Sequence, residues 1–427
     1  RLLVTRFISN ADYGEVYDIL TAGGMSFRDE AQPSIRINKI WVPDDIDHGS
    51  GVANYLRSIV IDPKDEFAYV TANKANIERG EYLSGIALSA DNTIRSMIAV
   101  LDLSTHSDTN VDALTREGTT DVQNSADPSG LTALPDGTTG VYALQGSNRI
   151  ALYDFGSEST LSVNVGSAPQ SLCVTEDNLY VKNYTDRMMS IIDIKDYIST
   201  GNTALTSESI VMTAPENDVL SATELQGLQL FYSANQSELS PEGYMSCASC
   251  HDGGGHDGMT WDFTHMGEGL RNTLSLRGIG GTRFGPLNWS ASADEVQDIE
   301  KQLEQLHGSN GFIPGATFTE QSPLNHMSAG SSVELDALSD YVSSLGKHSV
   351  LKSPNNCAWG DQECWSTYYS GSWQYYSHGC KDCHTRDSHS SGAFRDGLTH
   401  DVGTISETSG LGSGALLTGI RTPTLIN

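Results

Sequence analysis

Basic residues are scarce in this sequence, and long apolar runs are missing from it. Lys and Arg number 25 against 54 Asp and Glu, which gives a formal net charge of −29. Such an excess of negative charge repels nucleic acid and anionic lipid, and it favours basic or cationic partners. No stretch approaches the roughly 18 uninterrupted apolar residues that a membrane-spanning helix requires. The sequence therefore predicts no nucleic-acid partner and no transmembrane segment.

Cysteine is also uncommon, with seven residues in 427, and the positions of these few are informative. Four of them fall in two Cys-x-x-Cys-His motifs. Cys357 and Cys364 flank a short polar loop that a disulfide could close, which would suit an oxidising compartment. Cys173 lies in an apolar, strand-like segment, where we expect a buried free thiol.

Residues 1–213 carry a repeated strand pattern. Short β-branched and aromatic runs alternate with turns that contain Asp or Gly, and we predict three units of three strands. These cover residues 56–63, 67–70 and 96–103, then 129–137, 140–144 and 148–154, then 168–174, 178–181 and 189–194. The later units repeat at about forty residues, a period typical of β-propeller blades, which bury their sheet faces by radial packing. We therefore predict an all-β propeller over residues 1–213. Residues 1–20 read as outer strands of an earlier blade, so we expect the propeller to be incomplete at the N-terminus.

The pattern changes to helices near Pro215. Ser-led capping boxes predict helix starts at Ser221, Ser292 and Ser331, each followed by apolar residues at helical spacing. Gly308 lies where the second of these helices should end. Long Gly- and Ser-rich connections separate the helices, which suits a fold whose core is largely a cofactor. We predict mainly α-helical domains over residues 214–350 and 351–427, the second of them truncated.

The two Cys-x-x-Cys-His motifs occupy residues 247–251 and 380–384. Two thiols three positions apart can form thioethers with the vinyl groups of one haem, and the next His then lies under the iron. A zinc or redox Cys pair is the alternative, but it does not require the His that both motifs carry. We therefore predict two covalently bound haem c groups, attached through Cys247, Cys250, Cys380 and Cys383, with His251 and His384 as iron ligands. Because such attachment takes place outside the cytoplasm, we expect a periplasmic or extracellular protein.

The sequence leaves the sixth ligand of each iron open. The side chains able to bind iron after the first motif are His256, Met259, His265 and Met266. After the second motif come His389 and His400 but no Met, so either His400 is the ligand or the ligand lies beyond Asn427. The choice matters because axial ligands move haem potentials over about 0.8 V. Separately, the acidic cluster at residues 44–48 has ligands suited to calcium or copper, or is a solvated loop.

Residues 215–427 resemble the diheme cytochrome c peroxidase and MauG family, in the subset that carries an N-terminal propeller. The matching segments of the haem region are 244–251, 267–273, 332–338, 400–404 and 421–425. Arg57 and residues 145–148 and 168–170 match the propeller portion. The resemblance covers nearly the whole chain, and its haem-region motifs are the specific part.

The resemblance implies different roles for the two haems. The first haem would react with substrate, and the second would take in electrons from a small cytochrome, a cupredoxin or other cytochromes. Trp289 corresponds to the Trp that relays electrons between the haems, and His265 corresponds to the distal His. Calcium near the interface of the haems is implied as well.

Three functions follow as hypotheses. In the first, hydrogen peroxide is reduced at the first haem, with His265 or Glu268 moving protons and Trp289 passing electrons. In the second, both irons are six-coordinate and the protein only transfers electrons. In the third, a MauG-like or oxygenase reaction acts on a protein or polymer that the propeller recognises. The propeller fold alone does not identify that partner.

Overall fold

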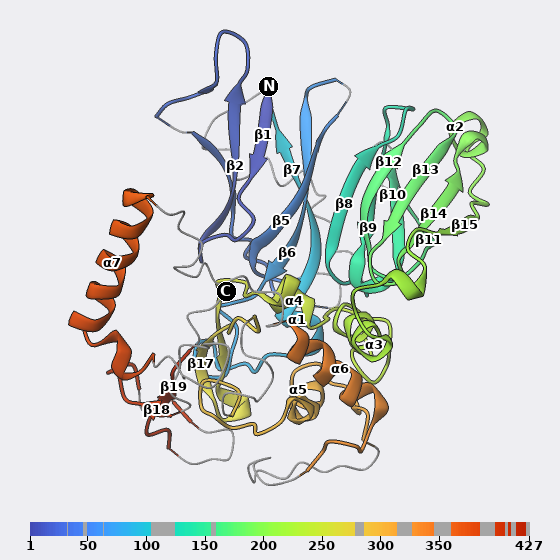
Figure 1. The fold of residues 1–427 in the computed structure, drawn as a ribbon. Coiled ribbons are helices and arrows are strands. Elements are labelled where there is room, and N and C mark those ends of the chain that lie inside the picture. Colours follow the sequence, from blue (N-terminus) through green and yellow to red (C-terminus); the bar gives the residue numbers. More distant parts are fainter. Residues whose placement is uncertain are drawn as a thin grey trace.

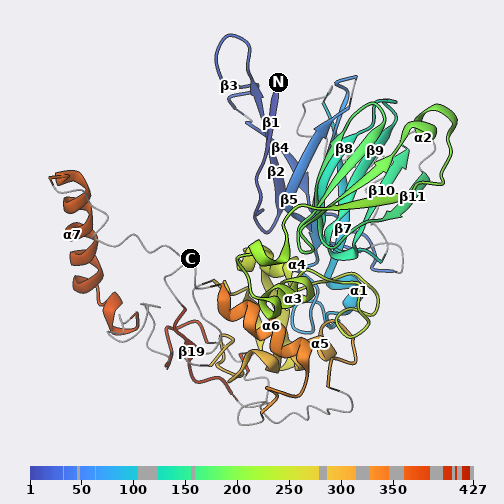
Figure 2. The same ribbon diagram turned by 45° about the vertical axis from the view of Figure 1, so that its right-hand side comes forward.

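The computed structural model describes residues 1–31, 33–45, 49–62, 64–103, 124–154, 159–277, 286–313, 327–345, 360–384, 398–405, 409–410 and 416–423. Antiparallel sheets fill the upper part of Figure 1, and short helices and strands lie beneath them; Figure 2 shows the same division from a second side. Among the described residues, no helix is long and apolar enough to cross a membrane.

The first two sheets come from residues before 103. One contains β1 (Leu2–Thr5), β2 (Tyr13–Leu20), β3 (Ser26–Phe27) and β4 (Ser34–Asn38). The other contains β5 (Val52–Ile61), β6 (Phe67–Ala75) and β7 (Ile94–Asp102), with the short helix α1 (Ala90–Thr93) before β7.

Two four-stranded sheets follow along the chain. The first is β8 (Pro128–Ala133), β9 (Thr139–Leu144), β10 (Arg149–Asp154) and β11 (Ser159–Asn164). The second is β12 (Pro169–Val174), β13 (Asn178–Asn183), β14 (Met188–Asp193) and β15 (Ser207–Val211), with α2 (Lys195–Thr200) between its last two strands. In both sheets each strand pairs with the next one in the sequence, as a meander.

The leading strands of successive sheets lie against one another: β5 contacts β8, and β8 contacts β12. Apolar side chains between the last two sheets form one core, which contains Leu134, Val141, Ile150, Leu179 and Ile192. This arrangement of stacked antiparallel sheets is consistent with propeller-like β domains. The predicted three-strand units are confirmed as β5–β7, β8–β10 and β12–β14, and the sequence prediction missed β11 and β15.

Cys173 is exposed, so the prediction of a buried thiol is wrong. Side chains alternate between the two faces of a strand. In β12 the neighbours Leu172 and Val174 pack against the apolar core between the sheets, which turns the thiol of Cys173 to the opposite face.

The helical part is built around two crossing helices, α3 (Ala222–Phe231) and α6 (Val333–Ser344). They approach so closely at Gly227 that a Cβ on this residue would lie 1.9 Å from the Ala337 carbonyl oxygen. The remaining elements are α4 (Ala248–His251), α5 (Glu300–Gln305), α7 (Gln362–Ser377), and the strand pairs β16 (Thr260–Phe263) with β17 (Gly269–Asn272) and β18 (Thr399–His400) with β19 (Ile420–Arg421). Short 3₁₀ turns include Gln145–Ser147, Pro215–Asn217, Asp252–Gly254, Thr264–Met266, Val296–Ile299 and Cys380–Asp382.

The helix starts agree with the capping boxes at two of three places. Ser221 caps α3 with Glu224 in a complete capping box, and α6 begins one residue later than predicted, with Ser332 as its cap. The predicted start at Ser292 is wrong: the helical segment begins after Glu295, which forms a capping box with Asp298. The Ser292 hydroxyl instead donates to Glu268 at 3.1 Å.

Candidate functional site

A cavity of about 680 Å³ lies beside α4 in the helical part of the molecule. Its wall contains Cys247, Cys250 and His251, the three functional side chains of the first motif. Apolar side chains that line it include Phe231, Leu274, Leu276, Leu287, Val296, Ile299, Leu303, Leu306, Leu338 and Val342. The volume falls within the range of about 300–1,000 Å³ that is typical of ligand and cofactor sites.

The first motif folds as one helical turn, which explains how its two thiols reach the same cavity. Cys250 is three residues after Cys247, and residues at this spacing share a face of a helix. The Nδ1 of His251 lies 3.1 Å from the Gly255 carbonyl oxygen and donates to it. This hydrogen bond fixes the tautomer and leaves Nε2 with its lone pair, as in metal-binding histidines.

The protonation of the two thiols argues against a redox pair. Neither Cys247 nor Cys250 is in a disulfide. Burial raises the pKa of Cys247 to about 12 and that of Cys250 well above its usual value, where Asp257 adds to the effect. Redox-active cysteines have depressed pKa values, because the thiolate is the reactive form. These two thiols are therefore held neutral.

A bulge in β5 brings side chains of the sheets to the motif. The pairing of β5 with β6 shifts register between Asn54 and Ser58, and Tyr55 takes a left-handed conformation with φ 51°. Bulges re-aim side chains in this way. The Tyr55 hydroxyl donates to the Cys250 carbonyl oxygen at 2.9 Å, and the Asn54 amide donates to the Asp257 carbonyl oxygen at 2.9 Å. The sheet thus holds the polypeptide on both sides of His251.

Asp127 is a second link between the sheets and the motif. Its carboxylate is 1% exposed and accepts from the Ser246 hydroxyl at 2.5 Å and from the Asn73 amide at 2.9 Å. Ser246 directly precedes Cys247, so this buried carboxylate fixes the first cysteine relative to β6. A buried carboxylate is stable only when hydrogen bonds of this kind replace water.

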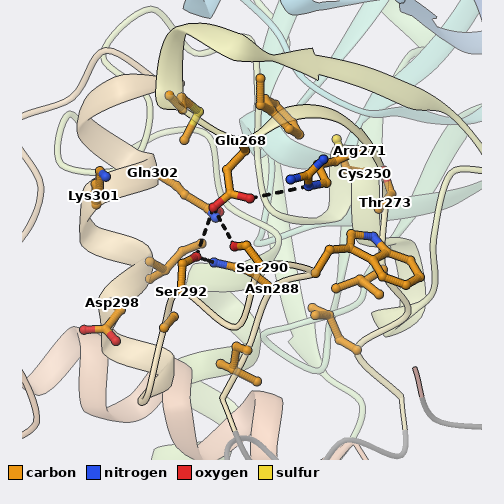
Figure 3. A pocket seen from close by; sticks show the side chains of 18 of the residues that line it. Cys250, Glu268, Arg271, Thr273, Asn288, Ser290, Ser292, Asp298, Lys301 and Gln302 are labelled. Carbon is orange, nitrogen blue, oxygen red and sulfur yellow. Dashed lines mark hydrogen bonds and ion pairs between the residues drawn. The ribbon is translucent and has the colours of Figure 1, made fainter. Parts of the chain in front are cut away.

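Glu268 lies in the cavity wall at the centre of a polar network, shown in Figure 3. Its Oε1 accepts from the hydroxyls of Ser290 at 2.7 Å and Ser292 at 3.1 Å. Its Oε2 lies 3.4 Å from the Nε of Arg271. Burial lowers the pKa of the Arg271 guanidinium, and the Glu268 carboxylate opposes that change. An acidic and a basic group thus meet at the cavity, and the catalytic role of Glu268 stays a prediction.

Trp289 also lines the cavity, next to a segment from the C-terminal part of the chain. Its Nε1 donates to the Asn272 carbonyl oxygen at 2.7 Å, and its own carbonyl oxygen accepts from the backbone N–H of Arg421 at 2.7 Å. Arg421 belongs to β19 and lines the same cavity, as do Thr399, Leu417, Thr418 and Gly419. Residues of the predicted second haem domain therefore help to close the site of the first motif.

His265 is not among the described residues that line the cavity, so its place beside the first iron stays a prediction. The side chain is half-buried, and burial lowers the pKa of its imidazole. The next residue, Met266, lies in the cavity wall instead and is 8% exposed. The 3₁₀ turn Thr264–Met266 gives neighbouring side chains different directions, so only one of the two reaches the cavity.

His307 lines the cavity and was missed by the sequence prediction. Its Nδ1 donates to the Leu239 carbonyl oxygen at 2.9 Å, and burial lowers the pKa of the imidazole to about 4. His307 lies just beyond the C-terminal end of α5 (Glu300–Gln305), in a bend that follows the helix, so no helical spacing or motif marks it in the sequence as a cavity residue. A neutral imidazole and a thioether thus share the cavity with His251.

The second motif lies apart from this cavity. Cys380, Cys383 and His384 follow α7, a helix that has no buried residue and stands away from the rest of the molecule in Figures 1 and 2. None of the three lines the cavity, and neither does His400 in β18. Cys364 is disulfide-bonded, while Cys357 and His389 lie outside the described residues.

A calcium site is not seen in the described part of the chain, where no group of three or more His, Cys, Asp or Glu side chains is placed to hold a metal ion. In the acidic cluster at residues 44–48, Asp44 pairs with Arg79 at 2.6 Å and accepts from the Ser50 backbone N–H at 2.9 Å. These contacts fit a structural loop. Asp47 and His48 lie outside the described residues.

No protein-family model and no curated protein matches the chain. Solved structures that are similar in part include hydrazine synthase of Kuenenia stuttgartiensis, at 12% identity and TM-score 0.31, over 45% of this chain and 55% of that one. Another is the periplasmic gluconolactonase PpgL of Pseudomonas aeruginosa, at 12% identity and TM-score 0.32, over 50% and 55%. A third is the β-propeller domain of Myceliophteria thermophila Cps50, at 10% identity and TM-score 0.23, over 40% and 41%. The chain spans about half the length of these structures, and none of the matches shows membership of the diheme peroxidase and MauG family.

Proposed function

We propose that the protein is an exported diheme c-type cytochrome that reduces hydrogen peroxide at the first of its two haems. The observation that carries the proposal is one cavity whose wall holds both thiols of the first motif, the imidazole of His251, whose Nδ1 donates to a backbone carbonyl, and the carboxylate of Glu268. The second haem would be attached at Cys380 and Cys383, with His384 as its ligand.

The residues around the cavity fit a haem. Its apolar lining suits the macrocycle, and neutral thiols beside a helical turn suit thioether attachment. The cations Lys301 and Arg421 in the wall suit the two propionate carboxylates. When bound, the haem supplies an iron that can bind peroxide and accept or give electrons.

In the proposed peroxide reduction, Glu268 is the residue that transfers protons. Hydrogen bonds from Ser290 and Ser292 and the ion pair with Arg271 fix the position of its carboxylate in the cavity wall. With a haem in the cavity, this carboxylate would accept a proton from one peroxide oxygen and donate it to the other, which would leave as water. The Arg271 cation stabilises negative charge that develops as the O–O bond breaks.

Electrons would enter at the second haem from a reduced small cytochrome, a cupredoxin or another cytochrome. The acidic surface, with its net charge of −29, favours a basic donor. Trp289 is the candidate relay, since its side chain lies in the cavity wall and its backbone bonds to β19 of the C-terminal segment.

The test begins with the chain exported by a host that attaches haem c. Peptide masses should show one haem on each motif, and the loaded protein should oxidise a reduced small cytochrome when peroxide is added. Glu268→Gln should lower the peroxide-dependent rate by about 10²–10⁴-fold with haem attachment intact. Glu216→Gln, which changes an exposed carboxylate outside the cavity, serves as the matched control. An unchanged rate in Glu268→Gln would contradict the assigned role.

Pure electron transfer is the second candidate, and a specific observation favours it. His307 and Met266 line the same cavity as His251, and either could fill the sixth position of the first iron. A permanently bound sixth ligand leaves no place for peroxide. In that case the loaded protein would exchange electrons with its partner and show no peroxide-dependent oxidation.

A further inference from the structure

A buried indole is paired with a buried carboxylate at the cavity of the first motif. Trp261 lines the cavity and is 1% exposed, and its Nε1 donates to Asp257 Oδ2 at 2.9 Å. Asp257 is also 1% exposed, and its Oδ1 accepts from the Met259 backbone N–H at 2.9 Å. Both carboxylate oxygens are thus bonded in a site that excludes water.

The pair adjoins the haem-attachment motif. Trp261 belongs to the apolar cluster against which Cys250 packs. The Asp257 backbone carbonyl is held by Asn54, and its carboxylate is close enough to Cys250 and His251 to act on the pKa of both. Any haem on Cys250 would therefore have this indole beside it.

The partner of the indole N–H distinguishes Trp261 from the other cavity tryptophan. Trp289 donates to a neutral backbone carbonyl and is only half-buried. A carboxylate that accepts the indole N–H favours positive charge on the ring far more than a carbonyl does, and the effect is larger in a low-dielectric interior. An ionised Asp257 therefore gives an oxidised Trp261 indole an opposite charge at hydrogen-bond distance, which Trp289 does not have.

Two tyrosine hydroxyls also reach the motif: that of Tyr232 lies 3.4 Å from the Asp252 carboxylate, and that of Tyr55 has surroundings that oppose oxidation. A tyrosine loses its phenolic proton when it is oxidised, so it needs a base as partner. The Tyr55 hydroxyl donates instead to the Cys250 carbonyl oxygen, and burial raises its pKa above the usual value. An indole cation keeps its N–H and needs no such base.

We propose that Trp261 is a redox-active residue that gives up one electron during peroxide reduction and holds the resulting charge as an indole radical cation beside Asp257. This inference rests on the proposed function, because it requires haem in the cavity and peroxide as the oxidant.

The electrons and protons balance as follows. Reduction of hydrogen peroxide to two water molecules breaks the O–O bond and consumes two electrons and two protons. Trp261 gives one electron and the haem gives the other, while the indole N–H stays on its nitrogen in the bond to Asp257. The protons come from solvent by way of Glu268. The donor protein later returns two electrons, one of them to the indole.

The experiment is rapid-freeze EPR of the haem-loaded protein after one equivalent of peroxide, in the absence of a donor. We expect an organic-radical signal whose hyperfine pattern narrows when the protein carries ring-deuterated Trp. Trp261→Phe should abolish the signal and Asp257→Asn should reduce it, whereas Trp289→Phe should leave it in place. The labelling of unmutated protein keeps the test valid if a core variant folds poorly.

The outcomes separate this inference from the proposed function. If peroxide leaves the haem spectrum unchanged, the proposed function fails, and the inference fails with it. If the haem reacts but the radical is insensitive to Trp labelling, or survives in Trp261→Phe and vanishes in Trp289→Phe, the inference alone is overturned. A haem that reacts without any organic radical overturns it as well.

Discussion

At the residue scale, His251 and His307 have the same surroundings in the structure, but only His251 can be recognised as a cavity residue from the sequence. In each, Nδ1 donates to a backbone carbonyl oxygen, of Gly255 and Leu239 respectively, and the ring lines the cavity. His251 follows a Cys-x-x-Cys pair and so can be recognised from local spacing. The position of His307, in the bend that follows α5, depends on tertiary packing and carries no local signal.

His307 should make the stability of the fold depend on pH. Its folded pKa, about 4, is below the usual 6.5 because burial disfavours the charged ring. The unfolded chain therefore binds the proton first, and stability that is present above pH 6.5 is lost as the pH falls toward 4. The loss should amount to about 3 kcal/mol of unfolding free energy.

His307→Asn provides the control, since its side-chain amide can still donate to the Leu239 carbonyl. Urea unfolding of both proteins at several pH values between 4 and 7 gives the difference curve. The unfolding free energy of the unsubstituted protein should fall relative to that of His307→Asn as the pH is lowered through this range. A difference in free energy that does not change with pH would mean that His307 does not titrate there.

The sequence predicted the cavity residues whose positions follow from local spacing or from the family resemblance. Cys247, Cys250 and His251 lie on one helical turn, and the resemblance added Glu268 and Trp289, which both reach the cavity. Trp261 was not predicted, because its place depends on the pairing of β16 with β17, and of the neighbours His265 and Met266 it is Met266 that lines the cavity. Which of two adjacent side chains faces a cavity is set by tertiary packing.

At the element scale, strands with strong apolar alternation could be predicted and weak edge strands could not. In β11 and β15 most side chains are exposed, so these strands carry little hydrophobic pattern. The helix start predicted at Ser292 fails for a different reason. The hydroxyl that could cap a helix donates to Glu268 in the cavity instead.

The crossing of α3 and α6 should be sensitive to a single methyl group. In Gly227→Ala the added Cβ would lie 1.9 Å from the Ala337 carbonyl oxygen and 2.7 Å from the Tyr341 Cβ, so the two helices must separate. We expect a loss of about 3 kcal/mol of unfolding free energy, measured by urea titration.

Gly371→Ala is the matched control, because Gly371 is in α7 with no atom near the added Cβ. An exposed helical Gly→Ala change should stabilise its helix by about 0.5–1 kcal/mol. Equal effects of the two substitutions would contradict the close helix crossing.

At the scale of the whole molecule, the sheets and the haem region are joined at the first motif. Tyr55, Asn54 and Asp127 reach from the sheets to the backbone or side chains around Cys247 and Cys250. Arg57 adds a buried cation 3.6 Å from Asp252. The propeller-like sheets thus help to hold the motif in position through hydrogen bonds to its backbone and its neighbours.

Tyr55→Phe tests this coupling, because it removes only the hydroxyl that bonds the Cys250 carbonyl. We expect a loss of about 1–2 kcal/mol of unfolding free energy and faster amide hydrogen exchange in residues 247–259. Tyr180→Phe, at a half-buried position of β13, is the control and should change neither. If amide hydrogen exchange in residues 247–259 is the same in Tyr55→Phe as in the unsubstituted protein, the sheet does not stabilise the motif.

The central claim is a haem c in the cavity with a sixth position that peroxide can reach. The most direct measurement is the optical and EPR spectrum of the loaded ferric protein and of its half-reduced form, with and without cyanide or peroxide. The account predicts a high-spin signal from the first haem that shifts when either ligand is added. Two low-spin haems, indifferent to both ligands at every reduction level, would contradict it and leave an electron carrier.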